Sequence, residues 1–152
     1  MTFEVLAPVT GRVAAMEDVA DPVFSQGLVG PGIALVPDED GPQDAVAPIA
    51  GRILKLHPHA FVIVSESGPG VLVHLGLDTV GLDGEGFTLL HAENDTVDAG
   101  EPVITWDPAA VRAHGLDTVV TVVVMNLDNP RITARTAVGE RTARGRALLD
   151  VD

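Results

Sequence analysis

The chain has 152 residues, a formal net charge of −13 and no cysteine. This length suits one domain, residues 1–152, with its own hydrophobic core. The lack of cysteine excludes disulfides, thiolate metal sites and a cysteine nucleophile, and it fits a cytoplasmic protein. The negative charge repels phosphate backbones, so nucleic acid is not an expected partner. The N-terminus does not resemble a signal peptide. The sequence also has no uninterrupted stretch of about 20 apolar residues, so the chain is not expected to be embedded in a membrane.

Short β-prone runs between glycines and prolines predict an all-β fold. The phrase at residues 7–13 returns, with similar residues, at 47–53, and each copy is typical of a strand entry, a glycine turn and a second strand. This repeat predicts a duplicated β motif that forms the two halves of one sandwich or barrel. Other expected strands are residues 33–36, 61–64, 71–75, 87–90, 103–106 and 119–125. A short helix is predicted between Asp107, a suitable N-cap, and Gly115.

Two histidines are expected to meet at the end of one β-hairpin. The β-prone segments 59–64 and 71–74 flank a cluster of turn residues. A tight turn in the middle of that cluster places His59 directly opposite His74, with their Cβ atoms roughly 4.5–5.5 Å apart. Such a pair could bind a metal through neutral imidazole nitrogens. Alternatively, one imidazole could be a nucleophile while the other donates a hydrogen bond to the group it carries.

The residues after His74 suit the second possibility. The carbonyl of Gly76 could hold one ring nitrogen of His74 protonated, which would leave the lone pair of the other nitrogen free to attack. Asp78 could orient an imidazole or receive an arginine from a partner. These three residues are therefore candidates for one site.

Two motifs, H-A-F at residues 59–61 and V-H-L-G-L-D-T-V at 73–80, are highly specific in combination. With further matching phrases along almost the whole chain, they resemble the glucose-type enzyme IIA of the bacterial sugar phosphotransferase system. The resemblance implies a flattened antiparallel β-sandwich or barrel of the duplicated hybrid type, with one or two short helical turns. It also implies a phosphotransferase component in which His74 accepts a phosphoryl group from phospho-HPr and passes it to a IIB domain.

The resemblance assigns supporting roles as well. His59 would stabilise the phosphoryl group without carrying it. Val23, Phe24 and Val80 would form an exposed apolar docking patch, with Asp128 in or around it. The implied partners are HPr, a sugar-specific IIB/IIC permease and regulatory targets. No cofactor would be required, and His59 and His74 could share a zinc ion only in a partner complex.

The chain departs from the family pattern before the first histidine. The family commonly has Thr-Asn before H-A-F, whereas this chain has His57-Pro58. The usual threonine partner of His59 is therefore expected to be absent, and His57 either replaces it or is exposed.

Three other classes of function share features with this sequence. A non-catalytic regulator that binds its targets according to phosphorylation state is the main alternative. Lysostaphin-like zinc peptidases have an H-x-x-x-D motif followed by an H-x-H motif. This chain has both motifs in the reverse order, with H-x-H at residues 57–59 and H-x-x-x-D at residues 91–95. A biotinyl or lipoyl carrier is rejected, because Lys55, the only lysine, lacks the flanking methionine and tight hairpin that such carriers have.

Overall fold

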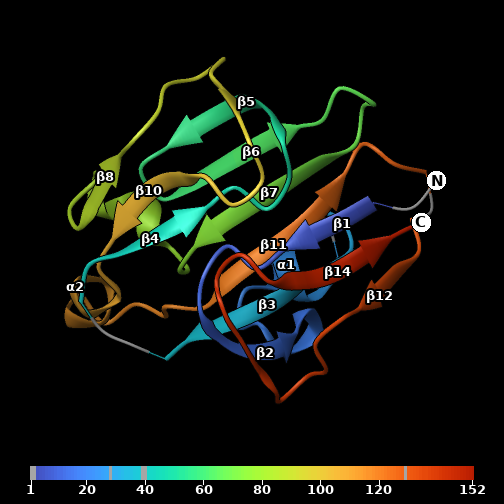
Figure 1. Cartoon of the computed structure of the whole chain (residues 1–152). Coiled ribbons are helices and arrows are strands. Elements are labelled where there is room, and N and C mark those ends of the chain that lie inside the picture. Colours follow the sequence, from blue (N-terminus) through green and yellow to red (C-terminus); the bar gives the residue numbers. More distant parts are fainter. Residues whose placement is uncertain (1–2, 28, 39–40, 129) are drawn as a thin grey trace.

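The chain folds into antiparallel β-sheets that stack in two layers (Figure 1). The structure is a computed structural model that describes residues 3–27, 29–38, 41–128 and 130–152. Within these residues, a large open sheet has the strand order β13-β2-β3-β11-β7-β6-β5-β9, and two three-stranded sheets have the orders β1-β14-β12 and β4-β10-β8. The strands are β1 (Phe3–Leu6), β2 (Gly11–Ala15), β3 (Gly32–Pro37), β4 (Gln43–Val46), β5 (Gly51–His57), β6 (Ala60–Val64), β7 (Gly70–Leu75), β8 (Phe87–Leu89), β9 (Thr96–Val97), β10 (Pro102–Trp106), β11 (Val120–Met125), β12 (Ile132–Ala134), β13 (Arg141–Thr142) and β14 (Ala147–Val151). The predicted β-sandwich is confirmed.

The strand order of the sheets has a two-fold pattern. In this pattern β13 corresponds to β9, β2 to β5, β3 to β6 and β11 to β7, and the two small sheets correspond to each other. The repeated phrases occupy matching positions and contact each other across this relation. Leu6 N donates to Pro48 O at 2.9 Å, and Val46 N donates to Pro8 O at 2.9 Å. The predicted duplication is therefore confirmed, as two halves that share one core.

The large sheet has two apolar faces. Along β7, Val71, Val73 and Leu75 belong to the main core between the layers. Because successive strand residues point to opposite faces, Leu72 and His74 lie on the outer face. A second, smaller cluster of buried residues lies there, made of Val19, Phe24, Ala34, Leu77, Val119 and Val123. The outer face of β7 is thus where His74 meets the surface.

Both α-helices in the described part of the chain begin at an Asp-Pro pair. In α1 (Pro22–Ser25), Val23 N donates to Asp21 Oδ1 at 3.0 Å, and in α2 (Pro108–Ala113), Ala109 N donates to Asp107 Oδ1 at 2.9 Å. An aspartate N-cap followed by proline at the first helical position favours helix initiation. Two short 3-10 helices, η1 (Met16–Asp18) and η2 (Thr79–Leu82), complete the described elements.

The helix expected between Asp107 and Gly115 is confirmed as α2. The helix α1 was not among the individually expected elements, although Asp21-Pro22 carries the same signal. Within the described residues, none of the helices is long and apolar enough to span a bilayer.

The predicted register of the β6–β7 hairpin is wrong by one residue. Ala60, and not His59, pairs with His74. The turn encloses an odd number of residues, because Ser65 N donates to Pro69 O at 2.9 Å, and this shifts the ladder by one position. His59 lies just before β6, in the turn after β5, so strand alternation does not dictate its direction.

Candidate functional site

One hydrogen bond fixes the imidazole of His74. Its Nδ1 lies 2.6 Å from the carbonyl oxygen of Gly76. Because a carbonyl oxygen only accepts, Nδ1 carries the proton and Nε2 keeps a free lone pair. Gly76 has a φ of +80°, and a Cβ there would lie 2.6 Å from Cγ2 of Thr79. The backbone that holds His74 therefore requires glycine at this position.

Burial and nearby charges act in opposite directions on His74. The pKa of His74 is lowered from 6.5, first by burial, while the Gly76 hydrogen bond and the carboxylates of Asp21 and Asp78 raise it. Burial has the larger effect, so the neutral imidazole is favoured. Asp21 was not among the predicted site residues. Its signal in the sequence was the Asp-Pro pair that begins α1.

The His59 ring lies against His74. Their ring centroids are 5.1 Å apart and the rings are nearly perpendicular, at 71°. The main chain is tied at the same point, because Leu75 N donates to His59 O at 2.8 Å. The pKa of His59 is lowered to about 4 by burial first, and then by the neighbouring His74 and His57. Two neutral imidazoles therefore face each other at one end of β7.

His57 extends this pair into a row of three rings. It lies at the end of β5, and its ring stacks on that of His59 with centroids 5.7 Å apart and an angle of 21°. His57 is exposed, which is one of the two outcomes expected for it, and its contact with His59 is made by the ring face. The contact is a ring stack in place of the threonine contact that the family pattern would provide.

The three apolar residues expected to form the docking patch differ in their exposure. Val23 on α1 and Val80 on η2 are 47% and 66% exposed, whereas Phe24 is 7% exposed and belongs to the smaller cluster. The expectation that the side chain of Phe24 is exposed is wrong. Because α1 lies on the outer face, the ring of Phe24 turns toward the sheet and contacts the His74 ring, with centroids 5.3 Å apart.

Two predicted acidic residues take different positions. Asp78 is exposed directly after the His74 turn, with a left-handed φ of 59°. Asp128 is exposed beyond the far end of β11, since Thr121, near the start of that strand, is the residue that pairs with His74. Asp78 therefore adjoins the histidines, whereas Asp128 follows the opposite end of the neighbouring strand.

The remaining histidines form separate pairs. His91 lies between Asp95 and Glu101, and His114 Nε2 lies 2.6 Å from Glu85 Oε2. Among the described residues, no group of three or more His, Asp or Glu side chains is arranged to hold a metal ion. The H-x-x-x-D pair and the H-x-H pair therefore do not combine into the ligand set that a zinc peptidase needs.

The fold and the paired imidazoles define a duplicated β-sandwich protein with a two-histidine surface site. The sequence matches the family described as phosphoenolpyruvate-dependent sugar phosphotransferase system, EIIA 1, over residues 3–130. It is 33% identical over 149 residues to the glucose-specific EIIA component of Oceanobacillus iheyensis. The aligned residues cover 97% of this chain and 88% of that protein.

Two further similarities agree. The chain is 44% identical over 130 residues, or 84% of its length, to the glucose-specific EIICBA component of Streptococcus pneumoniae, of which it spans 18%. Its structure is similar to glucose permease IIA from Mycoplasma capricolum, with a TM-score of 0.89, 30% identity, and 99% and 96% of the two chains covered. The chain therefore belongs to the EIIA 1 family of the sugar phosphotransferase system. Membership favours the phosphocarrier interpretation over the regulatory and peptidase alternatives.

Proposed function

We propose that this chain is a cytoplasmic phosphocarrier of sugar uptake, in which His74 accepts a phosphoryl group from phospho-HPr and passes it to a IIB domain. The observation that carries the proposal is the 2.6 Å contact between His74 Nδ1 and Gly76 O. It selects the tautomer whose Nε2 is a nucleophile, and burial keeps that nitrogen unprotonated. Family membership supplies the reaction for which this nucleophile is suited.

In this reaction the lone pair of His74 Nε2 attacks the phosphorus atom of phospho-HPr. A new N–P bond forms on His74 while the N–P bond of the donor breaks, and its electron pair returns to the imidazole of HPr. The transition state is loose, so positioning in line and stabilisation of charge contribute more than covalent assistance. The exposed side chains of Val23 and Val80 beside the site would exclude water from the labile phosphohistidine.

The neighbouring residues have supporting roles in the proposal. The neutral ring of His59 would donate one hydrogen bond to a phosphoryl oxygen, and His57 would hold that ring by stacking on it. Asp78 is exposed next to the site and would accept an arginine of HPr. Asp128 would contact a partner only at the periphery. The similarity to an EIICBA component supports a IIB/IIC permease as the partner that receives the phosphoryl group.

The proposed reaction requires no cofactor in this chain. His59 and His74 present two imidazoles, whereas structural zinc sites use four protein ligands and catalytic sites three. A zinc ion at this pair would therefore need ligands from a partner. We place it only in a partner complex.

The decisive experiment is incubation of the chain with phosphoenolpyruvate, enzyme I and HPr, followed by intact mass measurement. One acid-labile phosphoryl group is expected, and His74→Ala should abolish it. His114→Ala, which removes an exposed imidazole elsewhere, should remain fully labelled. Labelling that survives in His74→Ala, or that resists acid, would contradict the proposal. Onward transfer from the labelled protein to a IIB domain distinguishes a carrier from a purely regulatory protein.

A further inference from the structure

A hollow bordered by arginines lies far from the paired histidines. It has a volume of about 370 Å³ and is bordered by Arg135, Arg141 and Arg146 together with Thr136, Glu140 and Thr142. These residues come from the segment after β12, from β13 with the residue before it, and from the turn before β14. In the sheet order, β13 is four strands from β7, which is roughly 20 Å at the usual strand spacing. The hollow also lies outside residues 3–130, the part that matches the family.

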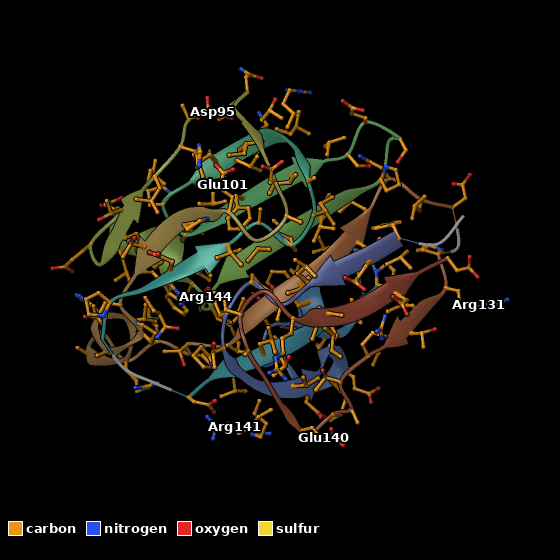
Figure 2. All side chains as sticks on the ribbon, in the orientation of Figure 1. Asp95, Glu101, Arg131, Glu140, Arg141 and Arg144 are labelled. Atoms are coloured by element: carbon orange, nitrogen blue, oxygen red, sulfur yellow. The ribbon has the colours of Figure 1, made fainter. Side chains whose placement is uncertain are left out.

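The charge of this region is opposite to that of the rest of the chain. Residues 131–146 contain five arginines and one acidic residue, Glu140, although the whole chain has nine lysines and arginines against 22 acidic residues. Figure 2 shows Glu140 and Arg141 at the lower end of the molecule and Asp95 and Glu101 near its upper end. The two ends of the duplicated fold therefore differ in charge.

These two ends correspond to each other residue by residue. Val13 N donates to Glu140 O at 2.8 Å, and in the repeated half Ile53 N donates to Asp95 O at 2.9 Å. Glu140 thus occupies the place of Asp95. The β13–β2 pairing and the β9–β5 pairing match in the same way, with Thr142 opposite Gly11 and Val97 opposite Gly51.

The same correspondence continues along the next turn. Ala7 N donates to Arg146 O at 2.7 Å, and Ala47 N donates to Glu101 O at 2.8 Å, so Arg146 occupies the place of Glu101. Arg135 N donates to Leu148 O where Leu90 N donates to Val103 O. The residue after Arg135, which is Thr136, therefore occupies the place of His91.

The correspondence explains why the hollow exists. In one half, the His91 ring lies between two carboxylates, with Nδ1 3.1 Å from Asp95 Oδ2 and Nε2 2.7 Å from Glu101 Oε2. In the other half, Thr136 is too short to reach across, and an arginine stands where the second carboxylate was. The hollow is the place of the missing imidazole. Arg146 replaces Glu101 there and Glu140 keeps the carboxylate of Asp95, while Arg135 and Arg141 add positive charge.

The arginines around the hollow retain free donors. Arg135 uses Nη1 toward Asp150 and Glu4, and Arg141 uses Nε and Nη2 toward Asp38. A guanidinium has five N–H donors, so both keep some available. Within the described residues, the side chain of Arg146 has no hydrogen-bond or ion-pair partner.

We infer that this hollow binds a small organic phosphate, such as a sugar phosphate or bisphosphate. A phosphate monoester brings three acceptor oxygens and a charge of about −1.5 to −2, which matches several guanidinium groups and threonine hydroxyls better than a monocarboxylate does. The volume is at the lower end of typical small-molecule sites, about 300–1,000 Å³. The bound phosphate would bridge the large sheet and the β1-β14-β12 sheet, away from the site proposed for phosphoryl transfer.

The test is calorimetric titration of the full chain with fructose 1,6-bisphosphate at fixed, near-physiological salt, with citrate as the non-phosphate anion. Arg146→Gln should weaken bisphosphate binding at least tenfold. Arg131→Gln removes the same charge from the same segment but does not border the hollow, and it should change affinity less than twofold. Arg146→Lys should also weaken binding, because lysine keeps the charge but lacks the planar fork.

A second variant tests the geometry rather than the charge. Thr136→His places an imidazole where the repeated half has His91, and it should block binding while the unfolding temperature stays near that of the wild type. His74→Ala should bind normally, which separates this site from the histidine pair and from the proposed phosphocarrier role. Equal losses in Arg146→Gln and Arg131→Gln, unchanged binding in Thr136→His, binding of citrate alone, or no binding of bisphosphate would each overturn the inference.

Discussion

The rings of His59 and His74 are 5.1 Å apart, although His59 lies outside the strand ladder that holds His74. The contact is made because His59 O accepts a hydrogen bond from Leu75 N, which anchors the turn before β6 to the end of β7. The position of His59 therefore depends on a turn, whereas that of His74 depends on a strand. The nucleophile proposed at His74 is thus held by the sheet, and the supporting group proposed at His59 is held by the turn.

The first prediction separates these two roles. His59→Gln should still accept a phosphoryl group from HPr, because an amide can donate a hydrogen bond to the phosphoryl oxygens. Transfer from His74 to a IIB domain should slow at least tenfold, because glutamine cannot gain a proton as the charge redistributes. Rapid-quench measurement of both half-reactions checks this. Identical rates for variant and wild type in both directions would remove His59 from the mechanism.

A second prediction concerns pH. The pKa of His59 is about 4 in the folded protein, below the ordinary 6.5. The fold thus favours the neutral ring, and this contribution to stability is present in full above pH 6.5 and is lost as the pH falls toward 4. His59→Gln should therefore flatten the decrease in unfolding free energy between these pH values. Urea unfolding across this range provides the measurement, and parallel curves for the two proteins would contradict the prediction.

Sequence patterns predicted the sheets better than they predicted the site. The repeat, the β-prone runs and the Asp107 cap all depend on local chemistry, and the structure confirms them. The register of the β6–β7 hairpin depends on the number of residues in one turn, which composition does not determine. Nevertheless, the rings of the two histidines meet, because His59 lies in the turn before β6, where strand alternation does not set the direction of its side chain.

Phe24 shows a second limit of the sequence. The family resemblance placed it on an exposed docking patch, and a four-residue helix presents no periodicity from which its buried side could be read. The contact of His91 with both Asp95 and Glu101 could not be predicted from the sequence either, because Glu101 belongs to a different turn. Contacts between turns follow from the duplicated topology and not from spacing along the chain.

The third prediction follows from the burial of Phe24. Phe24→Ser should lower the unfolding free energy by about 2–4 kcal/mol, because it removes a buried ring from the smaller cluster and leaves a cavity. Val80→Ser, at a side chain that is 66% exposed, should change stability by less than about 0.5 kcal/mol. It should nevertheless weaken HPr binding if Val80 lies on the docking face. Denaturation and binding titrations on the two variants check both statements, and a stable Phe24→Ser would refute the burial argument.

A fourth prediction concerns Thr121, which pairs with His74 across β11 and β7. Its hydroxyl is buried and has no hydrogen-bond partner among the described residues. An unsatisfied buried polar group costs about 1–3 kcal/mol, and valine has nearly the same shape. Thr121→Val should therefore raise the unfolding temperature while His74 still accepts a phosphoryl group. A destabilised variant would indicate that the hydroxyl has a partner, such as a bound water molecule.

The final prediction concerns the glycine that holds His74. At Gly76, an added Cβ would lie 2.6 Å from Thr79 Cγ2 and 2.9 Å from Asp117 O, on a backbone with a φ of +80°. Gly76→Ala should therefore cost about 1–3 kcal/mol of stability and move the carbonyl that orients His74. The rate of phosphorylation by HPr should fall by more than the loss of folded protein alone explains, because the tautomer of His74 is no longer fixed.

Two further variants make this prediction specific. Gly81→Ala adds the same methyl group in the adjoining 3-10 helix, where nothing lies within 4 Å of the new Cβ, and it should leave stability and phosphorylation close to the wild type. Gly76→Ala combined with Thr79→Ser removes the closest clashing carbon while keeping the hydroxyl that donates to Leu75 O at 2.7 Å. This double variant should recover part of the lost stability. An active Gly76→Ala protein with unchanged nuclear magnetic resonance signals for the His74 ring would show that the Gly76 carbonyl does not set the nucleophile.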